Sequence, residues 1–111
     1  VIKDELFERY RQGTDFIQRY IFPGGMLPSP SAFEAAAASN GLRVVDAFSF
    51  GQDYARTLAV WRSQFLAQLS KVRAQGFDER FIRMWDFYLA YCEAGFESGD
   101  TNVMHFTLER I

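Results

Sequence analysis

The chain has 111 residues, of which 49% are hydrophobic and 23% are charged, and this balance excludes a disordered chain. Its formal net charge of −2 provides no positive field for a phosphate backbone, so we expect no nucleic acid partner. The single cysteine, Cys92, excludes an internal disulfide, and one cysteine with one histidine is too few ligands for a zinc site.

The N-terminal segment predicts a strand end followed by a broken helix. Val1-Ile2-Lys3 opens the chain without an initiator Met, and we interpret it as the end of a strand in a truncated segment. Apolar residues then recur at helical spacing from Asp4 to about Tyr20, interrupted at Gly13-Thr14, which predicts one helix or two short ones. Residues 23–28 must form a loop, because the prolines fix the backbone and the glycines permit positive φ.

A further helix is predicted directly after this loop. Ser29 can cap it, and Pro30 suits the first helical position. Ser31 and Glu34 have the spacing of a capping box, and the alanines that follow favour helix. Asn40-Gly41 then ends the helix.

Two segments predict strands. Residues 42–50, LRVVDAFSF, are rich in β-branched and aromatic side chains, and residues 103–108 alternate apolar and polar side chains after the break at Gly99-Asp100. Two strands alone do not make a stable sheet in water. We therefore expect helices to cover them, and a neighbouring copy to supply partner strands in a homo-oligomer.

Between these strands, the spacing predicts a helical hairpin. One apolar stripe, with separations of three and four positions, predicts a single long helix up to Gly76. Asp78 can cap a second helix that repeats the stripe. The two stripes consist of Tyr54, Leu58, Trp61, Phe65, Leu69 and Val72, and of Phe81, Trp85, Tyr88, Cys92 and Phe96. Two such helices joined by a short turn should pack against each other, which makes the chain α+β.

The aromatic share of 17% leaves two interpretations open. The rings can fill an aromatic-rich core, or some of them can line a groove for an apolar ligand.

No apolar run approaches the ~20 residues of a membrane-spanning helix, and the N-terminus lacks the form of a signal peptide. We therefore expect a cytoplasmic protein that is not transmembrane.

Several motifs do not support catalysis by this chain alone. Gly24-Gly25 lies between two predicted helices rather than after a strand, so it is a turn and not a phosphate cradle. Cys92 and His105 lie on different predicted elements without the spacing of a nucleophile and base. The acidic pairs near helix starts, such as Asp4-Glu5, are explained by the helix dipole.

Four segments, in this order, carry a resemblance to a known family. They are FIQRYIFPGGML at 16–27, GQDYARTLAVW at 51–61, YLAYCEAGF at 88–96 and VMHF at 103–106. Together they resemble the C-terminal part of cyclopropane-fatty-acyl-phospholipid synthases and mycolic acid methyltransferases, and the likeness covers nearly the whole chain. It implies a truncated C-terminal segment, residues 1–111, of a Rossmann-like S-adenosylmethionine-dependent methyltransferase fold. In that fold an edge strand, a helical hairpin over the substrate and an antiparallel last strand follow the first helices.

The resemblance also implies which residues touch the reactants. The full-length enzyme uses S-adenosylmethionine and a bicarbonate ion that accepts a proton, and Tyr88 matches the tyrosine that contacts bicarbonate. A phenolic hydroxyl suits an oxyanion in an apolar surround. The family positions that line the acyl-chain channel correspond to Tyr54, Leu58, Val60, Trp61, Trp85 and Cys92. Glu97 and His105 depart from the residues that relatives carry there.

We therefore expect the lipid-side segment of an enzyme that forms cyclopropane rings on unsaturated phospholipid acyl chains, peripheral to the membrane when full length. The segments that bind the coenzyme, and most bicarbonate ligands, are not in this sequence, so we expect no cofactor, no metal and no turnover in the isolated chain. Two alternatives remain: a stand-alone module that binds fatty acid, and an oligomerisation module whose aromatic stripes pack between copies.

Overall fold

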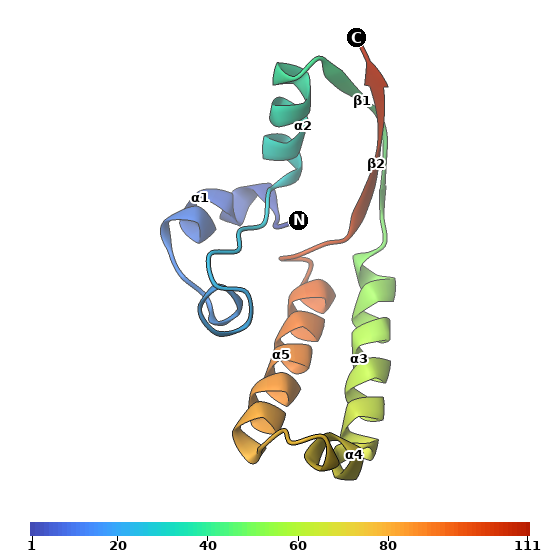
Figure 1. Cartoon of the computed structure of the whole chain (residues 1–111). Helices are drawn as coiled ribbons and strands as arrows, with labels where there is room; N and C mark the ends of the chain where they lie inside the picture. Colours follow the sequence, from blue (N-terminus) through green and yellow to red (C-terminus); the bar gives the residue numbers. More distant parts are fainter.

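The computed structural model describes residues 1–111 as an α+β chain of six helices and a two-stranded antiparallel sheet. In chain order the elements are α1 (Asp4–Gln12), the π-helix η1 (Ile17–Ile21), α2 (Pro30–Ser39), β1 (Leu42–Ser49), α3 (Gly51–Ala67), α4 (Leu69–Ala74), α5 (Glu79–Ser98) and β2 (Met104–Arg110). Figure 1 shows the β1–β2 ribbon at one end, with α2 beside it, and the antiparallel pair α3 and α5 at the other end. The α+β prediction is confirmed.

The molecule is extended rather than round. Its principal extents are 53 × 28 × 25 Å and its radius of gyration is 16.8 Å, whereas a compact domain of this length has about 13 Å. Only 8 of the 111 residues are buried. Many large apolar side chains are exposed, among them Phe22, Phe48, Trp61 and Phe87. Exposed apolar surface of this extent is typical of faces that contact further protein or ligand.

The first predicted helix is two short ones. The break follows α1, where Gly13 has an extended backbone and its N–H bonds to the Tyr10 carbonyl oxygen. The next turn is started by a reciprocal pair: the Gln18 N–H donates to Asp15 Oδ1 at 2.8 Å, and the Asp15 N–H donates to Gln18 Oε1 at 3.0 Å. This side-chain pairing begins η1 and sets the direction of the loop that follows.

The start of α2 confirms one predicted cap and corrects the other. Ser29 Oγ accepts from the Ala32 N–H at 3.1 Å, with Pro30 at the first helical position. The capping box that the spacing of Ser31 and Glu34 suggests is wrong. Ser31 already lies inside the first turn, so its free N–H and hydroxyl instead donate to the Asp4 carboxylate at 3.0 and 2.8 Å. This contact joins α1 to α2.

We expect Ser29→Ala to lower the free energy of unfolding by about 1 kcal/mol, because it removes the side-chain partner of one helix N–H. Ser29 is buried, so water does not replace the lost oxygen. Urea denaturation monitored by circular dichroism would measure the change. Ser63→Ala, at an exposed position within α3, should change stability by less than about 0.5 kcal/mol. Equal effects of the two changes would contradict the assigned cap.

The ribbon has one covered face and one open face. Its strands pair from Leu42↔Arg110 to Ser49↔Met104, with an irregularity between Val44 and Asp46. Phe106 of β2 stacks on Phe33 of α2, with ring centroids 4.4 Å apart. Phe48, on the other face, is exposed. Both strand predictions are confirmed, and so is the antiparallel pairing that the resemblance implies.

The beginning of the chain lies beside the segment that enters β2. Ile2 forms an antiparallel bridge with Thr101, and the Lys3 N–H donates to the Asp100 carbonyl oxygen at 2.9 Å. The Ile2 N–H donates to the Pro28 carbonyl oxygen, also at 2.9 Å. The strand character predicted for Val1-Ile2-Lys3 is therefore present as a short extended pairing.

The helical hairpin forms, but its first arm is not one continuous helix. The predicted helix up to Gly76 is interrupted at Gln68, where the backbone has φ −116° and ψ 20° and the chain turns into α4. Arg73 of α4 then bonds to Glu79 at the start of α5, at 2.6 Å. The chain must turn there to reach the second arm, and no glycine or proline marks the break.

None of the helices is both long and apolar enough to cross a membrane.

Candidate functional site

The two arms of the hairpin meet along a narrow buried seam. Ala55 and Leu58 of α3, and Ile82 and Leu89 of α5, supply the buried side chains of this seam. On one flank of the seam the Arg62 guanidinium donates to Asp86 at 2.6 Å. That hydrogen bond is the main reason why the pKa of Arg62 is raised. One flank of the hairpin is therefore polar.

The other flank carries the aromatic face, which we define as Tyr54 and Trp61 of α3 and Trp85, Tyr88 and Cys92 of α5. Separations of three, four and seven positions place these side chains on the same side of each helix. The Tyr54 ring lies 5.9 Å from that of Trp61, and the Trp85 ring lies 5.0 Å from that of Tyr88. Phe96 joins the face across the seam, 4.9 Å from Tyr54.

Tyr88 is the polar group at the centre of this face. Its ring contacts Trp85 on its own helix and Phe22 from the N-terminal loop, at a centroid distance of 6.3 Å. Burial, and then the neighbouring Cys92, raise the pKa of the Tyr88 hydroxyl to about 12. The group is therefore protonated at neutral pH, and it can donate a hydrogen bond to an oxyanion in an apolar surround.

Cys92 lies one helical turn beyond Tyr88. Burial is the main cause of the raised pKa of its thiol, so the thiol is protonated at neutral pH and is a poor nucleophile. His105, the only histidine, packs against Phe50 at 4.7 Å and pairs with Phe48 in the ribbon. The two residues belong to different regions of the molecule, as the sequence suggested.

The six positions assigned to the acyl chain do not all lie together. Tyr54, Trp61, Trp85 and Cys92 belong to the aromatic face. Leu58, only 3% exposed, lies in the buried seam between the helices. Val60, 53% exposed, lies two positions from Leu58 and therefore points to the opposite side of α3. Contact of these residues with a lipid remains a prediction.

A strap, which we define as residues 15–27, crosses α5 beside the aromatic face. One hydrogen bond closes the strap on itself, from Gln18 Nε2 to the Gly25 carbonyl oxygen at 2.9 Å, and another ties its end to α1, from the Leu27 N–H to the Tyr10 hydroxyl at 3.0 Å. Gly24, with φ 79°, makes the turn that the sequence predicted. The aromatic rings of the strap pack on α5, where the centroid of the Phe16 ring lies 4.7 Å from that of Phe87.

The sequence predicted helix up to about Tyr20 and a loop at residues 23–28 of the strap, but it did not predict the contact of the strap with Tyr88. The contacting residue, Phe22, comes directly before Pro23-Gly24. An aromatic side chain held at a turn is a local signal for such a contact, but the sequence does not say which helix it reaches. The contact depends on the path of the chain between residues 22 and 88.

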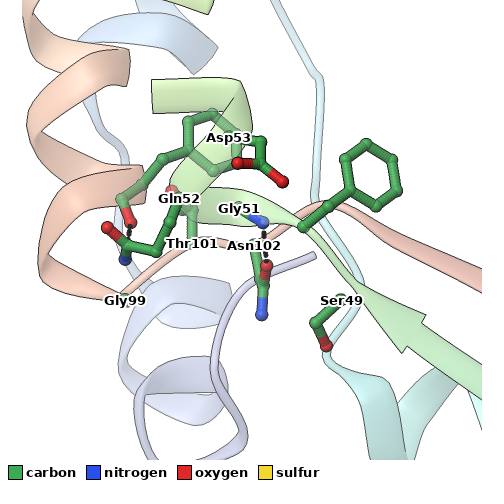
Figure 2. A pocket seen from close by; sticks show the side chains of 9 residues that line it. Ser49, Gly51, Gln52, Asp53, Gly99, Thr101 and Asn102 are labelled. Carbon is green, nitrogen blue, oxygen red and sulfur yellow. Dashed lines mark hydrogen bonds between the residues drawn. The ribbon is translucent and has the colours of Figure 1, made fainter. Parts of the chain in front are cut away.

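The junction between ribbon and hairpin is held by Asn102. Its Oδ1 accepts from the Gly51 N–H and from the Val103 N–H, both at 2.9 Å, and Figure 2 shows it beneath the first turn of α3. Gln52 Nε2 donates to the Phe96 carbonyl oxygen at 3.0 Å. A hollow of about 190 Å³ lies beside these residues, lined also by Ser49, Asp53, Gly99 and Thr101. The junction sets the angle at which the hairpin leaves the ribbon.

No three side chains among His, Cys, Asp and Glu gather closely enough to hold a metal ion. The chain also has no glycine-rich turn between a strand and a helix, since Gly24 and Gly25 separate η1 from α2. The described residues therefore provide the Tyr88 hydroxyl, a hydrogen-bond donor, at the centre of a largely apolar face. Such a face is suited to an apolar chain with a reacting group near the hydroxyl.

Comparison with known proteins identifies the family. A family model described as mycolic acid cyclopropane synthetase matches residues 2–106, so the chain belongs to this family. The resemblance drawn from the four sequence segments is thus confirmed.

The relatives are lipid-modifying transferases. The chain is 48% identical over 101 residues to tuberculostearic acid methyltransferase UfaA1 of Mycobacterium tuberculosis, across 90% of this chain and 24% of that protein. It is 35% identical over 95 residues to cyclopropane-fatty-acyl-phospholipid synthase of Escherichia coli K12, across 86% of this chain and 24% of that protein. The chain therefore spans about a quarter of the length of these curated relatives.

Solved structures match the fold with the same partial coverage. Mycolic acid cyclopropane synthase CmaA1, complexed with SAH and CTAB, superposes with a TM-score of 0.82 at 31% identity, across 96% of this chain and 36% of that one. Cyclopropane synthase MmaA2 of Mycobacterium tuberculosis gives a TM-score of 0.81 at 25% identity, across 96% and 40%. The α+β arrangement thus matches part of the larger structures of these two cyclopropane synthases.

Proposed function

We propose that this chain forms the C-terminal, lipid-side segment of an S-adenosylmethionine-dependent methyltransferase that forms cyclopropane rings on unsaturated phospholipid acyl chains. The observation that supports it most is the aromatic face, where a protonated tyrosine hydroxyl lies among rings and a half-buried thiol. A relative with the same fold is complexed with SAH and CTAB. Such a face would shelter a hydrocarbon chain and hold the Tyr88 hydroxyl beside the reacting carbon atoms.

The coenzyme supplies the transferred carbon when it is bound, but this chain does not carry the residues to hold it. Coenzymes of this kind bind at a glycine-rich turn after a strand, with an acidic residue after the next strand. Neither pattern occurs here, so we propose that the other part of the enzyme binds the coenzyme. The isolated 111-residue segment then binds no S-adenosylmethionine and has no turnover.

Tyr88 fits the role of a donor to a bound bicarbonate ion. Its hydroxyl keeps its proton, because burial raises its pKa to about 12. Phe22 and Trp85 pack against the ring and limit its rotation. The family places bicarbonate where it accepts the proton that the substrate loses, and Tyr88 would hold that ion in position. Its remaining ligands belong to the part of the enzyme outside this chain.

Binding of the lipid tail follows from the apolar character of the aromatic face. Each methylene group that leaves water contributes about 0.8 kcal/mol, so a chain of several methylene groups supplies much of the binding free energy without a polar contact. Tyr54, Trp61, Trp85 and Cys92, which belong to the aromatic face, would make this contact. Leu58 would support them from the seam, and Val60 would face a different part of the enzyme. We propose that the complete enzyme acts at a membrane surface as a homo-oligomer.

The direct test uses the complete enzyme and the isolated segment side by side. We expect the complete enzyme to transfer radiolabelled carbon from S-adenosylmethionine to dispersed dioleoyl phospholipid, with mass spectrometry identifying the product as a ring or a methyl branch. The isolated segment should show neither transfer nor calorimetric binding of the coenzyme. Micromolar coenzyme binding by the segment, or a complete enzyme that is inactive on every unsaturated lipid, would overturn the proposal.

A further inference from the structure

A groove on the flank of α5, next to the strap, has no role in the chemistry proposed above. It has a volume of about 390 Å³ and is lined by Phe16, Tyr20, Arg80, Arg83, Met84 and Phe87. Its lining combines three aromatic rings and a thioether with two guanidinium groups. This composition differs from that of the aromatic face, where no positively charged side chain takes part.

The two arginines of the groove have no carboxylate at ion-pair distance. Neither Arg80 nor Arg83 forms an ion pair within 4.0 Å of a carboxylate, since the five ion pairs of the chain involve other basic side chains. Glu79, one turn from Arg83, is bonded to Arg73 instead. Arg19 adds a third positive charge, with its guanidinium 5.4 Å from the centre of the Tyr20 ring.

The apolar part of the groove is open to the outside. Tyr20 is 49% exposed and Phe87 is 51% exposed, although both rings are large. Tyr91, also exposed, extends the patch along α5, 5.8 Å from Phe87. Aromatic side chains beside arginines are the composition that protein surfaces use at the boundary between lipid headgroups and hydrocarbon.

We propose that this groove docks the enzyme on a bilayer through anionic phospholipid headgroups. Arg80 and Arg83 bind the phosphate oxygens, while Tyr20 and Phe87 insert at the level of the headgroups. This inference rests on the proposed function, because an enzyme that acts on a membrane lipid has to bind the membrane surface in which that lipid lies. Charge complementarity selects the occupant, because three positive charges without a close ion pair, beside exposed rings, match an anionic amphiphile.

The test is sedimentation of the complete enzyme with sucrose-loaded vesicles. Equal mixtures of phosphatidylglycerol and phosphatidylcholine should bind the wild type, and pure phosphatidylcholine should bind it much more weakly. Each arginine near an anionic surface contributes about 1 kcal/mol, so Arg80→Gln with Arg83→Gln should weaken vesicle binding about 30-fold. Binding by the wild type should also fall as salt is raised.

Two matched variants distinguish an effect of the groove on vesicle binding from an effect of net charge and from a loss of folding. Arg56→Gln with Arg110→Gln removes the same charge from exposed positions elsewhere and should change binding less than about threefold. Arg80→Lys with Arg83→Lys keeps the charge and should retain binding. The proposal is overturned if the wild type binds neither vesicle, if it prefers an acidic protein to the anionic vesicles, or if both glutamine pairs weaken binding equally.

The readout is independent of catalysis. Transfer of carbon to detergent-dispersed lipid should persist in the Arg80→Gln/Arg83→Gln variant, because no bilayer is needed there. Loss of transfer in the wild type would refute the proposed function, whereas intact transfer without vesicle binding would refute only the docking surface.

Discussion

Tyr88→Phe is expected to lower the kcat of the complete enzyme about 100-fold, which is the usual loss when one donor to a developing or bound oxyanion is removed. The ring remains, so the contacts with Phe22 and Trp85 persist and KM for the lipid should change little. The measurement is initial-rate transfer from S-adenosylmethionine to dispersed unsaturated phospholipid. An undiminished rate would remove Tyr88 from the site.

The same variant has a second readout in the folded protein. Burial raises the pKa of Tyr88 from 10.0 to about 12, so the folded state holds this proton more tightly than the unfolded chain does. The associated stability is complete below pH 10 and is lost as the pH rises through 12. Tyr88→Phe should therefore reduce the alkaline decline of the melting temperature. Tyr20→Phe, on an exposed ring, is the matched control.

Gly51→Ala is expected to lower the free energy of unfolding by about 3 kcal/mol. A Cβ at this position would lie 2.4 Å from Asn102 Oδ1 and 3.4 Å from Asn102 Cα. Moving that oxygen away breaks both of its hydrogen bonds, to the Gly51 and Val103 N–H groups. Urea denaturation would measure the loss. Alanine is the better helix former by up to about 1 kcal/mol, so helix propensity alone predicts a gain rather than a loss.

A double-mutant cycle with Asn102→Ala separates the steric clash between the new Cβ and Asn102 Oδ1 from the other effects of Gly51→Ala. Once the amide is absent, Gly51→Ala has nothing to displace, and its additional cost should fall below about 1 kcal/mol. If Gly51→Ala costs the same in both backgrounds, the collision with Asn102 is not the cause. A change at this junction would also alter the angle of the hairpin, so the transfer rate should fall in the complete enzyme.

Local patterns predicted the elements because their determinants lie close together in sequence. Asp78 caps α5 by accepting from the Phe81 N–H, three positions away, and Gly99 ends the same helix with φ 82°. The apolar stripe between them has a period that any helix must share. For the same reason Ser29 and the strand beginning at Leu42 were both recognisable.

The candidate site was only partly predictable. Spacing placed Trp85, Tyr88 and Cys92 on one side of α5, and the resemblance assigned Tyr88 a role. Spacing did not reveal that Leu58 lies in the seam, since a stripe that faces a partner helix and one that faces a ligand have the same period. Only the family resemblance assigned Val60 to the acyl-chain channel, and in the structure Val60 lies apart from the other residues assigned to that channel.

What the sequence determined by itself was most of the helices and strands, the caps at Ser29 and Asp78 and the family, because these depend on residues a few positions apart or on short motifs. Tertiary structure alone decided that Ser31 binds Asp4, 27 positions away, and that Asn102 holds Gly51, 51 positions away. It also decided the turn at Gln68 and the contact of Phe22 with Tyr88. Such contacts depend on the path of the whole chain, and no local propensity encodes that path.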